Sequence, residues 1–325
     1  MDEFDLIHSI TPHTLHHTSV DVGIGDDGAV YTASPDFQQI VCLDTMVEDV
    51  HFKLEYSTPE DIGYKALAVN ISDIAAMGGI PKFYLVSLAV PSYWQAAEVQ
   101  AMYEGMTELA KLYRMDLIGG DTVSASDKAV ITVTVIGEVE KGLACLRSSA
   151  RPGDVVFVTG DIGSSAAGLS LLLGETAPSA FSERDYFIQK HKRPVPRVQV
   201  GRFCSQLQHT ALNDISDGLA SELNEIAEAS SVTIEIEENL LPVHPDLRTA
   251  HSKWKEWALF GGEDFELAGT VSQKEWTWLL DRCKTSGVPI KQVGTVYERK
   301  EANVLMKTAD QKRIVLEKKG YNHFK

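Results

Sequence analysis

The sequence predicts an α/β or α+β protein built as two lobes. Its 325 residues, 44% of them hydrophobic, suggest two domains more readily than one or three. Strand-like and helix-like segments alternate along the chain, and the pattern restarts after the turn at residues 151–154. We therefore expect one domain over residues 1–149 and a second over residues 150–325.

The first domain is expected to contain two strands with a helix between them. Residues 38–43 and 129–136 are rich in β-branched side chains, and the second run alternates Val or Ile with Thr, which is typical of strands. Between them Thr58 can cap a helix, Pro59 suits its first turn, and the Gly-Gly pair at 78–79 can end it. The predicted helix is about 19 residues long.

The second domain is expected to repeat strands and helices. Residues 155–158 and 232–236 read as strands, because they are short β-branched runs. Residues 164–173, which are rich in Ala and Leu, and a segment ending near residue 229 read as helices. A turn at residues 261–267 carries a further group of acids.

Composition limits the choice of partners. A formal charge of −16 argues against nucleic acid and anionic membranes, which need a basic footprint. The one basic stretch, residues 190–197, is expected to be a solvated connector stiffened by two prolines, with a phosphate clamp as the alternative. No apolar run approaches the roughly 18 residues of a membrane span, and the acidic N-terminus is unlike a secretory signal. Four widely spaced cysteines without zinc-ligand spacing indicate reduced thiols in a cytoplasmic protein.

Five short acidic motifs stand at glycine turns or at the ends of predicted strands. Two carboxylates about 5 Å apart repel each other by about 3 kcal/mol at an effective dielectric of about 20. If folding brings the motifs together, bound cations are therefore needed. The motifs are Gly25-Asp26-Asp27, Asp44-Thr45, Ser72-Asp73, Gly119-Gly120-Asp121 and Asp214-Ile215-Ser216-Asp217-Gly218.

Taken singly, each motif also has a plain structural explanation. Residues 23–28 satisfy G-x-G-x-x-G, but a strand-like segment follows where a dinucleotide site requires a helix. Asp73 lies on a largely apolar helix, so it either pairs with a cation such as Lys65 or ligates a metal. Asp217 can be a helix N-cap. The glycines before Asp121 are expected at a strand end, where backbone N–H groups can approach a phosphate.

In chain order, these segments closely resemble the thiamine-monophosphate kinase family over the whole length. The matching segments are G-I-G-D-D, D-T-x-V-E-D-V-H-F, Y-K-A-L-A-V-N-I-S-D-I-A-A-M-G, L-I-G-G-D-T, V-T-G, I-S-D-G-L, G-G-E-D-F-E-L and G-Y-N-H-F. That family belongs to the aminoimidazole ribonucleotide synthetase superfamily, whose members share an ATP-binding, dimer-forming N-terminal lobe with a mixed sheet or half-barrel and an α/β C-terminal lobe. The resemblance implies a homodimer that converts thiamine monophosphate and ATP to thiamine diphosphate and ADP with several Mg²⁺ ions.

The resemblance also implies roles for individual residues. The implied magnesium ligands are Asp27, Asp44, Asp73, Asp121, Asp214 and Asp217, with Cys42 and Leu43 completing the shell. The implied nucleotide contacts are Tyr103, Gly120, Asp121, Arg147 and Ser216. His51 and Glu263 match positions that line thiamine phosphate. Lys318 stands where related enzymes carry a tryptophan, and Tyr321 is the aromatic residue available to replace it.

The implied chemistry needs no general base, because a phosphate with a second pKa near 6 is already mostly dianionic at pH 7. Bringing two polyanions together is the obstacle, and metal-assisted in-line transfer answers it. The chain accordingly has neither G-x-x-x-x-G-K-[ST] nor the H-R-D kinase set. Two alternatives stay open at this point: an aminoimidazole ribonucleotide synthetase-like enzyme, and a catalytically silent nucleotide or metal sensor.

Overall fold

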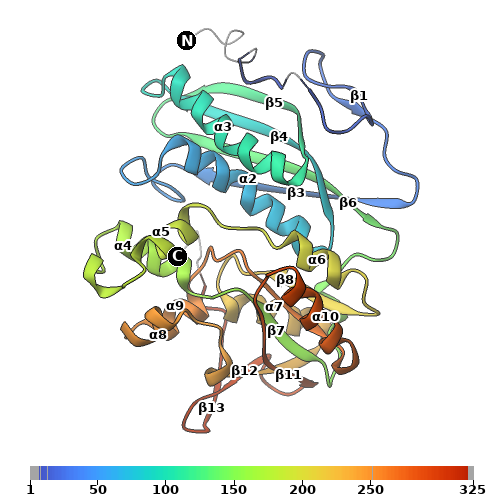
Figure 1. The fold of residues 1–325 in the computed structure, drawn as a ribbon, viewed down its shortest axis with the longest axis vertical. Helices are drawn as coiled ribbons and strands as arrows, with labels where there is room; N and C mark the ends of the chain where they lie inside the picture. Colours follow the sequence, from blue (N-terminus) through green and yellow to red (C-terminus); the bar gives the residue numbers. More distant parts are fainter. Residues whose placement is uncertain (1–6, 8, 13, 251, 321–325) are drawn as a thin grey trace. The chain divides into compact units, whose positions relative to one another are not determined.

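The computed structural model describes residues 7, 9–12, 14–250 and 252–320, and the chain forms two compact units (Figure 1). The first unit contains the chain up to Ile74 together with Gly79–Gly142. The second contains Ala75–Gly78 and the chain from Leu143 onwards. Each unit combines a sheet with helices, which confirms the mixed α/β class predicted from the sequence.

The first unit is built on a mixed four-stranded sheet in the order β3-β6-β4-β5. Its strands are β3 (Phe37–Val47), β4 (Ile80–Pro91), β5 (Asp116–Ala125) and β6 (Val130–Glu140). Only the β4/β5 pair is parallel. Helices α2 (Pro59–Ala76) and α3 (Ala96–Tyr113) lie against one face of this sheet (Figure 1). The Thr58 hydroxyl accepts the Asp61 N–H at 3.3 Å, so the predicted helix and its cap are confirmed.

The two faces of this sheet differ in polarity, as the Val/Thr alternation predicts. Val133 and Val135 of β6 are fully buried on the helix-covered face. On the opposite face, the Thr45 and Thr132 hydroxyls lie 2.8 Å apart, and Val41 is 65% exposed. This open face therefore carries apolar and hydroxyl side chains that no part of the described unit covers.

Two strands extend beyond their predicted ends. We expected Asp44 and the Gly119-Gly120-Asp121 motif at strand ends, but β3 continues to Val47 and β5 to Ala125. The reason is the ladder: β3 pairs with β6 as far as Val47, and β5 follows β4 through the motif. Gly120 permits this pairing, because a Cβ there would overlap the Val86 carbonyl.

A small antiparallel pair precedes this sheet. Strands β1 (Val20–Val22) and β2 (Val30–Tyr31) flank the glycine-rich turn at residues 23–28. The predicted strand after that turn is therefore confirmed, at the position where a dinucleotide-binding motif requires a helix.

The second unit contains a seven-stranded sheet in the order β13-β12-β9-β11-β7-β10-β8. All of its pairs are antiparallel except β12/β9. The strands are β7 (Val155–Thr159), β8 (Thr210–Asp214), β9 (Val232–Glu237), β10 (Leu267–Val271), β11 (Ile290–Glu298), β12 (Val304–Lys307) and β13 (Arg313–Val315). The strands predicted at 155–158 and 232–236 are therefore confirmed.

Helices pack on this sheet around one hydrophobic core that includes Val156, Val158 and Leu223. The helices are α4 (Ser164–Leu172), α5 (Arg184–Lys192), α6 (Val198–Cys204), α7 (Leu219–Ser230), α8 (Pro245–Ala250), α9 (Trp254–Phe260) and α10 (Gln273–Thr285), with 3-10 turns at Arg147–Ser149, Pro178–Ala180 and Glu238–Leu240. The helix predicted at 164–173 corresponds to α4, and the one ending near residue 229 corresponds to α7.

The four cysteines are free thiols. Burial raises the pKa of Cys145 to about 12 and that of Cys283 to about 11, so these thiols stay protonated and unreactive. None of the helices among the described residues is both long and apolar enough to cross a bilayer.

Candidate active site

The acidic motifs of the first unit lie in a turn, on a helix and on two strands. Asp27 lies in an exposed turn, where its N–H is bound by the Asp26 carboxylate at 2.9 Å. Asp73 is half-buried on α2, and Lys65, its suggested ion-pair partner, is buried two turns earlier on the same helix. Lys65 and Asp73 therefore both lie on the helix that packs against the sheet.

Asp44 and Asp121 are both exposed but point to opposite faces of the sheet. The register aligns Thr45, Thr132, Ser87 and Asp121 in one row and puts Asp44 in the adjacent row. Since side chains alternate along a strand, Asp121 shares the open face with Thr45, whereas Asp44 points to the other side. The sheet alone therefore does not bring these two carboxylates together.

The other predicted residues of the first unit are mostly held by their own neighbours. The Cys42 thiol lies 3.3 Å from the Asn70 carbonyl, to which it donates, while the Leu43 side chain is exposed. Tyr103 is buried on α3, and burial raises the pKa of its hydroxyl. His51 closes a tight turn in which its Nδ1 accepts the Val47 N–H at 2.9 Å. Of the residues predicted to contact nucleotide in this unit, Gly120 and Asp121 are exposed, whereas Tyr103 is buried.

In the second unit, two sequence motifs join into one continuous structure. Asp214 ends β8 opposite Leu267 of β10. Beyond the strands, Ile215 N–H donates to Glu266 O at 2.7 Å, and Glu263 N–H donates to Ser216 O at 2.7 Å. The loop at residues 214–218 and the turn at residues 262–266 are therefore held side by side by backbone hydrogen bonds.

Asp217 is not the N-cap of α7, contrary to its plain structural explanation. Gly218 occupies that position with φ 98°, a conformation that favours glycine. The Asp217 N–H instead donates to the Glu222 carboxylate at 3.0 Å. The Asp217 side chain is therefore one residue before the cap of α7, in the acidic loop itself.

Glu222 organises the acidic loop from within α7. Its carboxylate accepts the Asn213 amide at 2.5 Å as well as the Asp217 N–H. Burial, followed by the neighbouring charge of Asp214, raises the pKa of Glu222 to about 8. The loop is thus a region where negative charge is costly, and a bound cation would relieve that cost.

Arg147 is brought to the same loop. Its Nε and Nη2 donate to Asn213 Oδ1 at 3.1 and 2.9 Å, and its Nη1 lies 3.0 Å from Glu225 Oε2. The side chain is still 53% exposed. Of the predicted nucleotide and metal residues, the structure therefore gathers Arg147, Asp214, Ser216 and Asp217.

The C-terminal segment reaches this loop too. Gly320 packs so closely on the Asp217 carbonyl that a Cβ at this position would overlap it. Lys318 forms an exposed ion pair with Glu228 of α7 at 2.8 Å. Tyr321, the suggested substitute for an aromatic ring, lies outside the described residues.

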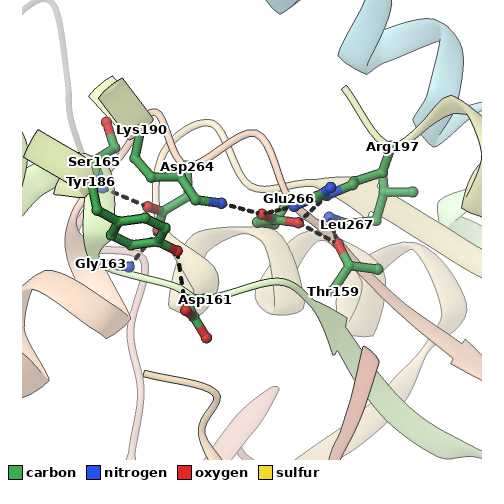
Figure 2. Close-up of polar contacts among 10 residues, drawn as sticks. All are labelled: Thr159, Asp161, Gly163, Ser165, Tyr186, Lys190, Arg197, Asp264, Glu266 and Leu267. Carbon is green, nitrogen blue, oxygen red and sulfur yellow. Dashed lines mark hydrogen bonds and ion pairs between the residues drawn. The ribbon is translucent and has the colours of Figure 1, made fainter. Parts of the chain in front are cut away.

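The basic stretch 190–197 is not a solvated connector, contrary to our expectation. Figure 2 shows Lys190 and Arg197 turned toward the buried carboxylate of Glu266. Arg197 binds it through two hydrogen bonds of 2.6 Å, Lys190 lies 3.0 Å away, and the Thr159 hydroxyl donates at 2.7 Å. Although burial alone would raise the pKa of Glu266, these cations hold it below its usual value. Both basic side chains are therefore committed to an internal ion pair and are not a phosphate clamp.

A second buried acid, Asp264, holds the start of α4. It accepts the Gly163 N–H at 2.6 Å and the Ser165 N–H at 3.0 Å, as Figure 2 shows. Burial raises the pKa of Asp264 to about 7, against these two hydrogen bonds and the charge of Lys190, which favour the carboxylate. This acid fills the helix N-terminus, a position that otherwise suits an anionic ligand.

The donor set fits Mg²⁺ better than a softer metal. Among the residues that the structure describes, no three His, Cys, Asp or Glu side chains are grouped so that they could hold a metal ion by themselves. The predicted ligands are carboxylates, and Mg²⁺ usually binds one or two carboxylates together with water and substrate phosphates. The acid-rich loop around Glu222, which carries Asp214 and Asp217, is suited to that mode of binding.

Sequence reasoning missed the residues that support the site: Asn213, Glu222, His191, Asp264 and Glu266. The signal for Glu222 was its position one turn into the helix that follows the acidic loop. Asp264 and Glu266 stand in the same acidic turn as Glu263, which is their only local signal. The pairing of Glu266 with residues about 70 positions away left no local signal.

Comparisons with known proteins agree on one family. The model of the AIR synthase related protein N-terminal domain matches residues 25–139, and that of the C-terminal domain matches residues 151–307. The thiamine-monophosphate kinase of Bacillus subtilis (strain 168) is 72% identical over 326 residues, covering 100% of both chains.

Solved structures resemble the chain as well. The crystal structure of thiamine-monophosphate kinase from Stenotrophomonas maltophilia K279a superimposes with a TM-score of 0.84 at 32% identity, covering 94% of this chain and 96% of that one. AaThiL complexed with AMPPCP and TMP superimposes with a TM-score of 0.77 at 34% identity, covering 99% and 97%.

Proposed function

The chain belongs to the thiamine-monophosphate kinases of the AIR synthase related family, and from that premise we propose how its residues carry out the reaction. The enzyme phosphorylates thiamine monophosphate at the expense of ATP. AMPPCP and TMP, the ligands of the 34% identical relative, support these two substrates. The observation that carries the proposal is the joined pair of loops in the second unit, which places Glu263 next to the segment bearing Asp214, Ser216 and Asp217.

Phosphate is the nucleophile, so the residues have to bind and align rather than remove a proton. Its second pKa near 6 makes it mostly dianionic at neutral pH. Arg147 offers an exposed guanidinium beside the acidic loop and is suited to a nucleotide phosphate. The strand backbone at Gly120 is exposed and carries no side chain, so a nucleotide phosphate can approach it closely.

We propose Mg²⁺ as the cation, with Asp27, Asp44, Asp73, Asp121, Asp214 and Asp217 as ligands and with Cys42 and Leu43 next to them. Bound Mg²⁺ would neutralise phosphate oxygens of both substrates. The acids gathered at the loop support a cation there, because the Asp217 N–H is bound by the Glu222 carboxylate and Asp214 lies near enough to raise the pKa of Glu222 after burial. The opposed directions of Asp44 and Asp121 favour several ions, each with few protein ligands, over one closed cage.

A homodimer is proposed on the basis of the open sheet face of the first unit. Val41 and Leu43 are 65% and 58% exposed there, and Val123 on β5 is 49% exposed. Exposed apolar side chains on an uncovered sheet face favour burial against a second copy.

Free cysteines support a cytoplasmic location.

The test is an ADP-release assay with ATP, Mg²⁺ and either thiamine monophosphate or the precursor of aminoimidazole ribonucleotide. We expect ADP and thiamine diphosphate only with thiamine monophosphate. ADP release only with the aminoimidazole precursor would support the synthetase alternative instead. Nucleotide binding without turnover of either substrate would identify a sensor.

A further inference from the structure

The turn at residues 262–266 points one acid outward and two inward. Glu263 and Phe265 have positive φ values of 66° and 48°, which is unusual for residues other than glycine. Asp264 and Glu266 are buried at 5% and 1% exposure, whereas the Glu263 side chain keeps 30% of its exposure. The strained backbone is maintained by the hydrogen bonds of the two buried acids and fixes the direction of Glu263.

Helix α5 holds this turn with two consecutive residues. Lys190 pairs with Glu266 at 3.0 Å, and the next residue, His191, places Nδ1 3.4 Å from Glu263 Oε2. The His191 side chain is only 4% exposed. Its Nδ1 also lies 3.1 Å from the Ser165 hydroxyl, and Ser165 in turn binds Asp264 through its N–H. Elements α4 and α5 therefore meet at the imidazole.

An imidazole at this position has a chemical advantage over a permanent cation. A neutral ring with its proton on Nδ1 can share that proton between the Ser165 hydroxyl and the Glu263 carboxylate, and it leaves the carboxylate charge intact. A lysine or arginine would neutralise that charge. The thiamine ring system is cationic, so a fixed carboxylate with its full negative charge suits this substrate better than a neutralised one.

We propose that His191 is a positioning residue, whose Nδ1 holds Glu263 in the orientation that receives the cationic part of thiamine monophosphate. The inference rests on the proposed function, which puts Glu263 beside that substrate. His191 acts through Glu263 and need not touch the substrate. The contact selects for thiamine monophosphate and leaves ATP binding alone.

Three substitutions at His191 test the geometry. His191→Ala removes the donor, His191→Asn keeps an amide N–H near the Nδ1 position, and His191→Gln moves it farther out. We expect Ala and Gln to raise KM for thiamine monophosphate about tenfold, with kcat and KM for ATP nearly unchanged. His191→Asn should keep KM for thiamine monophosphate close to the wild-type value. Equal behaviour of Asn and Gln, or parallel increases of both KM values, would overturn the proposal.

A double-mutant cycle with Glu263→Gln tests the route of the effect. If His191 acts through Glu263, His191→Ala adds little to KM in the Glu263→Gln background. A full additional factor there would contradict the proposal, and so would an unchanged KM in Glu263→Gln alone. An unchanged KM in Glu263→Gln would overturn only the role of His191, because the enzyme would still phosphorylate thiamine monophosphate. A wild-type enzyme that is inactive on thiamine monophosphate would instead overturn the proposed function.

His209 provides a matched control. It forms a partly buried pair with Asp154, 3.0 Å from its Nε2, in the same unit but outside the turn. His209→Ala should lower thermal stability without a selective change in KM for thiamine monophosphate. A selective change in this control would show that loss of any histidine pair produces the effect and would overturn the role assigned to His191.

Discussion

At the scale of single residues, the acids of the second unit have two different uses. Asp264 and Glu266 are buried, and their carboxylates accept hydrogen bonds from backbone N–H groups and from Arg197. Asp217 and Glu263 stand next to them in space and retain exposed surface. The buried acids determine where the exposed ones point, so a substitution at a buried acid is expected to act on stability first.

Asp264 gives a pH-dependent stability that can be measured. Its pKa is raised from 3.8 to about 7, so the folded state binds a proton more tightly than the unfolded state between those values. Its contribution therefore decreases as pH rises, by roughly 3 kcal/mol between pH 4.5 and 7.5. Urea unfolding of wild type and Asp264→Asn should show the difference between them shrinking over this range. A difference that is independent of pH would contradict the shift.

The residues of the acidic loop were easier to predict than the side chains that hold the loop in place. Asp214, Ser216, Asp217 and Arg147 were predicted, and the structure gathers them at one loop. The partners of Lys190 and Arg197 were missed, because Glu266 lies 76 and 69 positions away. A charge run looks solvated when only its neighbours in sequence are considered, and only tertiary packing identifies it as internal.

At the scale of elements, the ion pair of Arg197 with Glu266 ties the segment after α5 to the start of β10. Removing one member of a buried pair leaves an uncompensated charge. Arg197→Ala is therefore expected to lower the free energy of unfolding by about 3 kcal/mol, measured by urea denaturation.

Arg184→Ala is the matched control, because Arg184 pairs with Asp185 on the exposed surface of the same region. Arg184→Ala should cause no measurable change in the free energy of unfolding. If Arg197→Ala were equally silent, the pair would not stabilise the second unit.

Element types were easier to predict than element ends. The helix after Thr58 was found with its cap because capping residues are local signals. The ends of β3 and β5 were placed too early, because acids and glycines usually mark turns. Here the ladder continues through Asp44 and Gly120, since neighbouring strands supply hydrogen bonds that no single segment reveals.

At the scale of the whole molecule, the alternation of strands and helices was enough to predict two lobes of mixed α/β class. The order of the seven-stranded sheet was not predictable, because its neighbours are distant in sequence. The proposed homodimer rests on the open face of the first sheet.

Val41→Glu is expected to weaken the proposed homodimer, because it puts a charge among the exposed apolar side chains of the open face. Sedimentation velocity should show a shift from dimer to monomer. Leu112→Glu is the control, since Leu112 is 71% exposed on α3, outside the sheet. A Val41→Glu variant that remains as dimeric as this control would place the interface elsewhere.

In the proposed mechanism Asp121 and Asp217 both serve the phosphoryl transfer, and the kcat of Asp121→Asn and Asp217→Asn tests this role most directly. Both side chains are exposed. With saturating Mg²⁺, ATP and thiamine monophosphate, each variant should therefore lose at least about 100-fold in kcat while keeping the wild-type melting temperature. Asp281→Asn, at an exposed acid of α10, should be unaffected. Near-normal turnover of either Asp121→Asn or Asp217→Asn would contradict the proposed role of these acids.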